Sequence, residues 1–82
     1  DNIDLFLDAQ LRQVEIKLDR VTSYSKYSFQ IFDLIGKINL VRPINPQIEK
    51  QYISLEKINS GLYVFAVLKD GQVIFTKKIV VN

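Results

Sequence analysis

The chain has 82 residues with 11 basic and 9 acidic side chains, and it contains neither cysteine nor histidine. A chain of this length forms one domain that buries about 60% of the surface exposed on unfolding, and apolar packing has to stabilise it because disulfides and thiolate metal ligands are excluded. The charges are interspersed and give a formal net charge of +2, which is not the basic field that attracts nucleic acids, and no run reaches the roughly 18 apolar residues of a membrane span. We therefore expect no nucleic acid partner and no direct insertion into a membrane.

The amino end, DNIDLFLDAQ, starts without the basic residues of a secretory signal peptide. We expect either a cytoplasmic domain or a segment of a longer exported protein whose signal lies upstream. Within this end Ile3, Leu5 and Leu7 lie at alternate positions, and Phe6 is the one apolar residue between them. The alternation favours a strand, because a helix over residues 3–13 would have the poorer hydrophobic period.

The next segments alternate more regularly. Residues 13–19, QVEIKLD, place three apolar side chains on one face and the charges on the other, which predicts a strand with one face in water. After the turn-like segment RVTSYSK, apolar residues at every second position predict a third strand from Tyr27 to about Leu34. The segment DLIGK then reverses the chain.

A fourth strand is expected over residues 37–42. Its end is set by Pro43 and Pro46, because proline lacks an amide donor and restricts the residue before it. We therefore expect a surface loop or a sheet edge over residues 42–51. A short strand at residues 52–55 and a turn in EKINSG follow.

The carboxyl end is predicted to be a hairpin. Two strands rich in Val, Ile, Phe and Tyr, at residues 62–68 and 73–81, flank Asp70 and Gly71, and this dipeptide is the strongest short-range signal for a two-residue turn with positive φ. About seven short strands and no convincing helix predict an all-β fold, an antiparallel sandwich of two sheets. No linker or repeat interrupts the pattern, so residues 1–82 are expected to form a single domain, with residues 1–12 as its boundary segment.

Catalytic and metal-binding candidates are few. Without histidine no serine has its usual general base, so serine hydrolysis is disfavoured. Asp1, Asp4 and Asp8 could ligate a hard cation such as calcium, but their spacing matches no EF-hand loop, and alternating acids are more often the solvated face of a strand. The three glycines are too scattered to bind a phosphate. We expect no enzymatic activity, no cofactor and no metal.

Tyrosines offer a binding alternative. Tyr24 and Tyr27, on either side of Lys26 in the sequence, could stack on a sugar ring or a base. Aromatic residues of a small sandwich are more often core residues or members of cross-strand pairs, and we favour that interpretation.

Two local signals indicate turns. In IFDLIGK, Asp33 can cap the turn through its carboxylate, while Gly36 supplies a backbone angle that other residues avoid. In LEKINSGLY, two apolar side chains can tuck under the connection, Gly61 lets the chain bend, and Tyr63 begins the next strand with a phenol that needs a partner. Each signal by itself describes a hairpin or the corner of a sandwich.

A third signal lies in TKKIVVN. Lys77 and Lys78 must point to opposite faces of a strand, so one of them leaves the core or snorkels at its edge. Lysines at a sheet edge also prevent unwanted strand pairing.

Taken in this order, the stretches VEIKLD, SFQIFDLIGKINL and ISLEKINSGLYVFAVLKDGQVIFTKKIVV, with the chain end directly after them, resemble the type A C-terminal sorting domain of the type IX secretion system of Bacteroidota. The resemblance covers about residues 13–82. Members typically have an aspartate-leucine-x-glycine turn, a glycine-x-tyrosine step and a lysine in the last strand. In this chain those positions are Asp33, Leu34 and Gly36, then Gly61 and Tyr63, then Lys77 or Lys78. Residues 1–12 lack the asparagine-proline step and polar linker with which members often begin.

The resemblance implies an immunoglobulin-like sandwich that serves as a sorting signal for a covalently linked upstream cargo. The cargo would pass through the periplasm and be recognised by shuttle components and the translocon of the type IX system. A sortase would usually remove the domain and leave the cargo at the outer membrane and cell surface, or the cargo would be secreted. We expect the last hairpin and its lysines to form the recognition face, with an exposed edge open to strand addition.

Two other functions are compatible with the same fold. The same fold serves as a carbohydrate-binding or adhesive accessory module of extracellular proteins, for which Tyr24, Tyr27 or Tyr52 would be the contacts. It also serves as a spacer between domains, which would require further sequence after Asn82.

Overall fold

The computed structural model describes residues 2–20 and 24–82, and these residues form seven strands and no helix. The strands are β1 (Asn2–Asp8), β2 (Gln13–Asp19), β3 (Tyr27–Phe32), β4 (Ile38–Ile44), β5 (Lys50–Ser54), β6 (Gly61–Lys69) and β7 (Gln72–Val81). The cation-ligand candidate Asp1 and positions 21–23 of the expected turn lie outside the described residues. No helix of the described part is long and apolar enough to cross a membrane.

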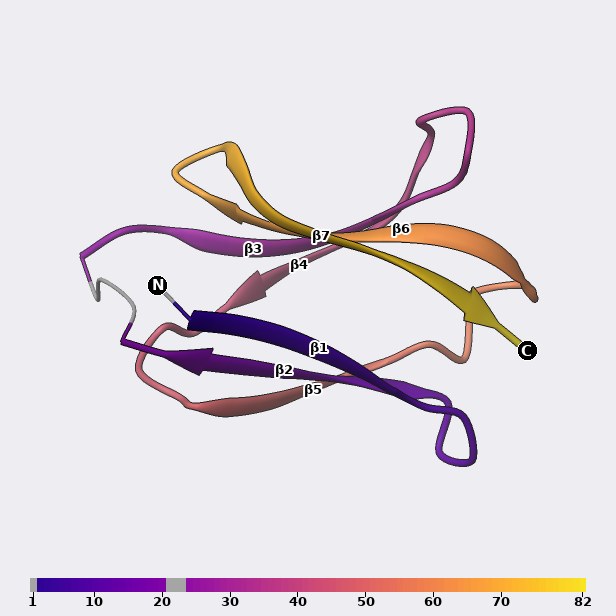
Figure 1. Ribbon diagram of the computed structural model, residues 1–82, viewed down its shortest axis with the longest axis horizontal. Coiled ribbons are helices and arrows are strands. Elements are labelled where there is room, and N and C mark those ends of the chain that lie inside the picture. The colour runs from indigo at the N-terminus through magenta and orange to yellow at the C-terminus, as the bar shows by residue number, and fades with distance from the viewer. Residues whose placement is uncertain (1, 21–23) are drawn as a thin grey trace.

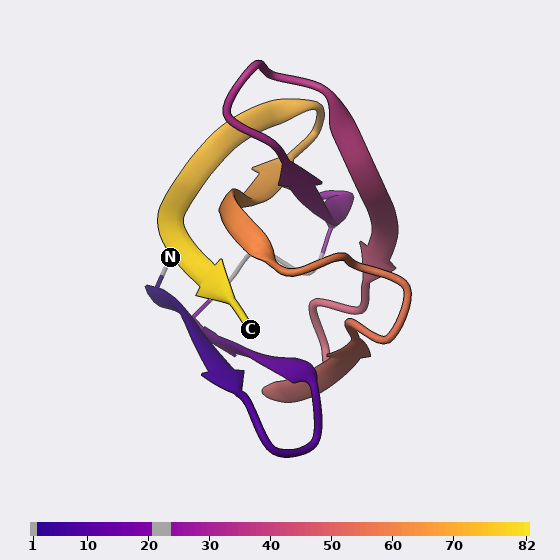
Figure 2. The ribbon, with the colours of Figure 1, turned by 90° about the vertical axis from the view of Figure 1, so that its right-hand side faces the viewer.

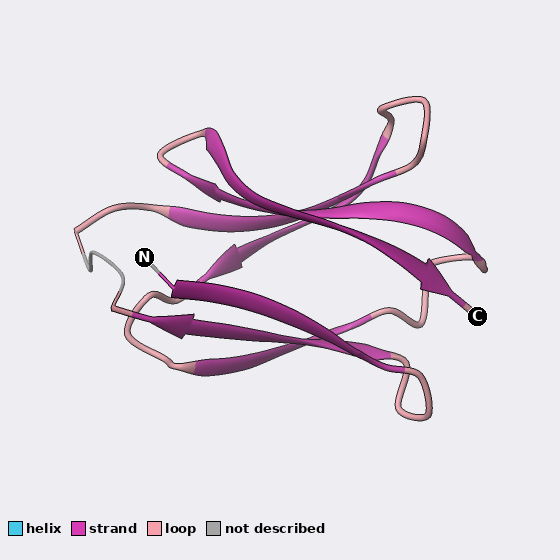
Figure 3. Cartoon of the chain, in the orientation of Figure 1, coloured by secondary structure: helices cyan, strands magenta, loops and turns pink. Residues whose placement is uncertain are grey.

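The strands pair into two antiparallel sheets that face each other across one core (Figure 1). One sheet has the order β1-β2-β5 and the other the order β4-β3-β6-β7. Strands make up about two thirds of the described residues, and turns and loops connect them (Figure 3). The predicted all-β sandwich is confirmed.

The position of β4 distinguishes this sandwich from the constant-type immunoglobulin domain. In the constant type the fourth strand joins the first, second and fifth, whereas here β4 pairs with β3 along six residues of that strand. The cause is local, because the tight turn after Phe32 folds β4 directly back on β3. An end view shows the two layers, with β1 and β7 on the same flank (Figure 2).

The strand boundaries follow the alternation of the sequence with three corrections. β1 is a strand, as its alternation favoured, and no helix forms over residues 3–13. β3 ends at Phe32 and not near Leu34, because Asp33 already belongs to the turn, and β5 spans Lys50–Ser54 in place of residues 52–55.

The third correction concerns β4. β4 continues through Pro43 to Ile44, so the expected end near residue 42 was too early. β4 is an edge strand of its sheet, and a proline at an edge can direct its missing amide away from the ladder.

The core lies between the sheets and is entirely apolar apart from tyrosine hydroxyls. Phe29 on β3 and Phe65 on β6 are fully buried and meet edge to face, with ring centroids 5.5 Å apart and planes at 81°. Leu55 and Ile58 tuck under the connection between β5 and β6, as the sequence predicted. Tyr27 is also a core residue with 3% of its surface exposed, which excludes it as a ligand contact.

The last hairpin turns as its Asp-Gly dipeptide predicted. Lys69 pairs with Gln72, so the loop consists of Asp70 and Gly71, with φ of +50° and +82°. The Asp70 carboxylate accepts a hydrogen bond from the Lys26 amide at 2.9 Å, and the Asp70 amide donates to the Lys26 carbonyl at 2.8 Å. This reciprocal pair fixes the hairpin to the segment that leads into β3.

The contact of Asp70 predicts a dependence of stability on pH. The Lys26 amide, helped by the Ser25 hydroxyl, lowers the pKa of the Asp70 carboxyl. A lowered pKa in the folded state stabilises the fold above the pKa of the unfolded chain, and that stabilisation is lost as the pH falls through the folded value. We expect an NMR titration to place the Asp70 midpoint below the ordinary aspartate range.

The variant Asp70→Asn isolates the charge, because asparagine also tolerates positive φ and retains an oxygen acceptor. We expect its free energy of unfolding to change less between neutral and acidic pH than that of the unchanged chain. An identical acid dependence in both proteins would contradict the assignment.

Candidate functional site

The first group of predicted recognition residues forms the turn between β3 and β4. The Asp33 carboxylate accepts hydrogen bonds from the amides of Ile35 at 3.1 Å and Lys37 at 2.9 Å. The Gly36 amide donates to the Asp33 carbonyl, and Gly36 has φ of +87°. Leu34 takes no part in these bonds, and 62% of its surface is exposed. Asp33 and Gly36 therefore build the turn, while Leu34 is presented to solvent.

The second group lies at the corner between β5 and β6. The Tyr63 ring is buried, and its hydroxyl donates a hydrogen bond of 2.7 Å to the carbonyl of Asn59. This is the arrangement of the tyrosine corner in immunoglobulin-like domains, where a tyrosine near the start of the sixth strand bonds to the backbone a few residues upstream. Gly61 lies beside that ring, and a Cβ atom at this position would be 3.5 Å from the Tyr63 Cε2 atom. The phenol thus has the partner that the sequence required.

The third group divides, because the two lysines of β7 have different surroundings. Lys77 lies opposite the buried Phe65, and its ammonium reaches across the flank of the sandwich to β1. There it donates a hydrogen bond of 2.8 Å to the Leu5 carbonyl, and it lies 3.7 Å from an Asp4 carboxylate oxygen and 5.3 Å from the centroid of the Phe6 ring. Lys77 is therefore the lysine that snorkels, and it bridges the two sheets.

Lys78 points the opposite way, onto the outer face of the four-stranded sheet. It lies opposite Val64 on β6, is exposed, and makes no hydrogen bond or ion pair with any described residue. Of the two predicted lysines, Lys78 is the one whose charge is available to a partner.

This difference gives a direct test with two neighbouring variants. Lys77→Gln should lower the free energy of unfolding by about 0.5–1 kcal/mol, since it removes the charged hydrogen bond to Leu5 and the contact with Phe6. Lys78→Gln should leave it unchanged within about 0.5 kcal/mol. Urea denaturation of both variants measures these changes. Equal losses of unfolding free energy in the two variants would contradict the assignment of Lys77 to the bridge and of Lys78 to solvent.

The strand register brings the three groups to one part of the molecule. Lys78, Val64, Phe32 and Ile38 are successive cross-strand partners on β7, β6, β3 and β4. The turn that contains Asp33 starts directly after Phe32, and Gly61 at the start of β6 pairs with Val81 near the end of β7. The predicted residues therefore surround one end of the four-stranded sheet, although they do not contact each other as a cluster.

Sequence reasoning missed Arg12, in the turn between β1 and β2. Its guanidinium donates to the carbonyls of Ile58 at 2.6 Å and Asn82 at 2.5 Å, with a longer bond of 3.4 Å to Leu55. The Arg12 carbonyl in turn accepts a bond of 2.8 Å from the Leu55 amide. This one side chain ties the end of β7 to the opposite sheet. Nothing local in the sequence distinguished it, because its partners lie 43 to 70 positions away.

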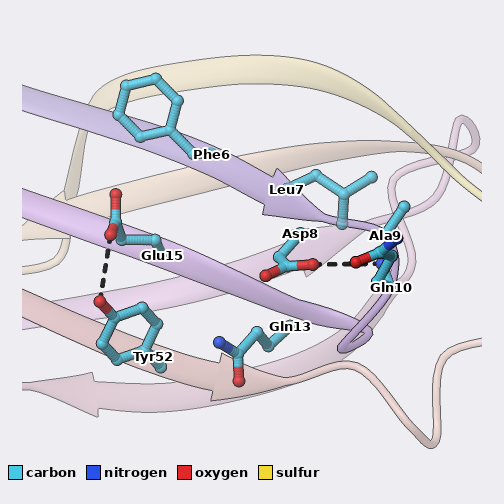
Figure 4. Close-up of a pocket in the computed structure, with 8 residues that line it drawn as sticks. All are labelled: Phe6, Leu7, Asp8, Ala9, Gln10, Gln13, Glu15 and Tyr52. Atoms are coloured by element: carbon cyan, nitrogen blue, oxygen red, sulfur yellow. Dashed lines mark hydrogen bonds between the residues drawn. The ribbon is translucent and has the colours of Figure 1, made fainter.

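An open hollow of about 390 Å³ lies on the outer face of the three-stranded sheet (Figure 4). The exposed rings of Phe6 and Tyr52 lie on either side of Glu15, and the Tyr52 hydroxyl donates a bond of 3.1 Å to the Glu15 carboxylate. That bond, with the charge of Glu15, raises the pKa of the Tyr52 phenol. The other tyrosines of the carbohydrate hypothesis are not at this hollow.

Among the described residues, no set of three or more His, Cys, Asp or Glu side chains gathers in a group that could hold a metal ion. Asp4 contacts Lys77, and the Asp8 carboxylate accepts the amides of Gln10 and Leu11 in the β1–β2 turn. These two acids have structural partners, which agrees with their interpretation as part of a solvated strand face.

In the comparison with known proteins, a family model matches most of the chain. Residues 11–82 match the model of the family described as the secretion system C-terminal sorting domain. The matched segment begins at the turn that holds Arg12 and includes β2 to β7. No curated protein matches the chain.

Proposed function

The chain belongs to the family of secretion system C-terminal sorting domains, and from this membership we propose how it acts as a type IX secretion signal. The match to that family, which extends over six of the seven strands, is the observation that carries the proposal. The domain directs the export of a covalently linked upstream cargo. Its family is one of sorting signals and not of enzymes.

The cargo crosses the periplasm with the domain folded, meets shuttle components and the translocon, and reaches the outer membrane and cell surface or is secreted. A sortase then removes the domain. A small rigid sandwich suits this role because a partner can read a fixed surface without remodelling it, which avoids the cost of ordering a flexible segment. The bridges made by Lys77 and Arg12 support this rigidity.

We place recognition on the last hairpin and on the residues that surround the same end of its sheet: Asp33, Leu34, Gly36, Gly61, Tyr63, Lys77 and Lys78. In this assignment Asp33, Gly36, Tyr63 and Lys77 act by holding the backbone in place. Leu34 and Lys78 are the exposed contacts.

The test is delivery of a reporter. The 82-residue chain is fused to the carboxyl end of a periplasmically exported reporter in a bacterium that has a type IX system, and surface and medium fractions are compared with those of the reporter alone. We expect delivery only with the domain attached, and a mature reporter whose mass lacks the domain. Retention of the fusion in the periplasm would overturn the proposal, and delivery at full mass would overturn the sortase step alone.

Carbohydrate binding is the second candidate, and the hollow beside Phe6 and Tyr52 is the observation that favours it. The two exposed aromatic rings can stack on a sugar, and the Glu15 carboxylate between them can accept hydrogen bonds from its hydroxyl groups. A glycan array with the unchanged chain and with Tyr52→Ala separates the candidates. Binding that is lost in the variant would support the carbohydrate module, and absence of binding would leave the sorting signal.

A further inference from the structure

The outer face of the four-stranded sheet is unusually apolar for a surface. Alternate residues of its strands point away from the core: Ser28, Gln30, Phe32, Ile38, Val41, Pro43, Leu62, Val64, Ala66, Leu68, Val73, Thr76, Lys78 and Val80. Antiparallel sheets of sandwiches normally alternate between an apolar inner face and a polar outer face. β6, with the sequence GLYVFAVLK, is instead apolar on both faces.

Apolar side chains gather at one end of this face. We call Phe32, Ile38, Leu62, Val64 and Val80 the outer apolar patch. Ile38, Phe32 and Val64 are cross-strand partners in one row, and Leu62 pairs with Val80 beside it. Ile38, Leu62 and Val80 expose 49%, 41% and 56% of their surface. Contiguous apolar surface of this kind on a soluble domain marks an interaction site.

The outer face of the other sheet provides an internal comparison. Its outward residues include four acids and two lysines: Asp4, Asp8, Glu15, Asp19, Lys17 and Lys50. The same chain therefore builds one solvated face and one apolar face on the same sandwich. An apolar composition of the whole sequence cannot explain this difference.

Charge on the apolar face is limited to one group. Lys78 extends the row formed by Ile38, Phe32 and Val64, and no acidic residue is among the outward residues of this sheet. Its ammonium has no hydrogen bond or ion pair with the described residues. An unpaired cation at the rim of an apolar patch calls for an anionic group on whatever covers the patch, because burying it unpaired would be costly.

We propose that the outer apolar patch with Lys78 is the surface that a protein of the secretion machinery binds, through apolar side chains and a carboxylate placed opposite Lys78. This inference rests on the proposed function and specifies the surface and the chemistry of its partner. A second copy of the chain fits poorly, since it would bring another unpaired lysine, and none of the outward residues of its four-stranded sheet is acidic. A lipid surface fits poorly as well, because a single cation contributes only about 1 kcal/mol of attraction to anionic lipids.

Matched surface variants in the reporter fusion test this. Lys78→Glu reverses the charge, and the double variant Leu62→Ser, Val80→Ser makes the patch polar. Their controls are Lys50→Glu on the outer face of the other sheet, and Leu11→Ser with Ile48→Ser at exposed apolar sites elsewhere. Thermal unfolding of the purified fusions verifies that the domain remains folded, which we expect because the altered side chains are all exposed.

We expect surface delivery to fall at least about tenfold for Lys78→Glu and for the patch variant, with both controls unchanged. Delivery of the patch and Lys78 variants at the level of the unchanged fusion would overturn the assigned surface and leave the sorting function intact. An equal fall in the controls would also overturn it. Failure of the unchanged fusion itself would overturn the proposed function and this inference together. Cosedimentation of the purified fusion with anionic phospholipid vesicles, lost in the patch variant, would replace the protein partner with a membrane.

Discussion

Replacement of Phe65 by alanine should lower the free energy of unfolding by about 3–5 kcal/mol. Phe65 is fully buried in the middle of β6, and its ring packs edge to face with the ring of Phe29 on the neighbouring β3. Removal of the ring loses its transfer free energy, the aromatic pair and the packing around the cavity that remains. A domain of this size has little stability to spare, so we expect the variant to be largely unfolded at 37 °C.

Urea denaturation followed by circular dichroism measures this loss. Tyr24→Ala is the matched control, because it also removes an aromatic ring but from a residue with 97% of its surface exposed. The control should change the free energy of unfolding by less than about 0.5 kcal/mol. Similar losses in the two variants would contradict the assignment of Phe65 to the centre of the core.

Local features of the fold could be predicted because their causes are local. Strict alternation in residues 13–19 fixes which face of β2 is buried, and the structure confirms it. The Asp70-Gly71 dipeptide fixes a two-residue turn because few other residues adopt positive φ. The same holds for Asp33 and Gly36, whose bonds lie within five consecutive residues.

The assignment of strands to sheets could not be predicted in this way. The fourth strand has two neighbours in the sequence, and it can form a hairpin with β3 or with β5. Alternation says nothing about which of these pairings forms. β6 presents a related difficulty, because in the run VFAVL every residue is apolar and no period distinguishes the core face from the outer face. The register resolves it by placing Phe65 inward and Ala66 outward.

The candidate site shows the same limit. The sequence showed that Lys77 and Lys78 point in opposite directions, but it could not identify which one is engaged. The partner of Lys77 is the Leu5 carbonyl, 72 positions away. Only the closure of the sandwich brings β1 beside β7, and that closure leaves Lys78 on the apolar face.

Replacement of Arg12 by methionine should lower the free energy of unfolding by about 2 kcal/mol, because hydrogen bonds from a charged donor contribute about 1.5–3 kcal/mol. Methionine retains the unbranched apolar stem of the side chain but not the guanidinium, so the variant removes mainly the bonds to Ile58 and Asn82. Arg12→Lys should restore little of the loss, since one ammonium cannot reproduce the fork that reaches both carbonyls.

Arg42→Met is the control for Arg12. Within the described part of the chain the Arg42 guanidinium donates only to the adjacent Val41 carbonyl, and the side chain is exposed. Its effect should be below about 0.5 kcal/mol. Hydrogen exchange adds a local measurement. Relative to the unchanged chain, Arg12→Met should increase the exchange rates of the amides at the end of β7 more than those at its start. The reason is that the lost bond to Asn82 held that end against the other sheet. If the end of β7 remained as protected as before and the stability matched that of Arg42→Met, Arg12 would be an ordinary surface residue. The two sheets would then be joined on this flank by Lys77 and the buried side chains alone.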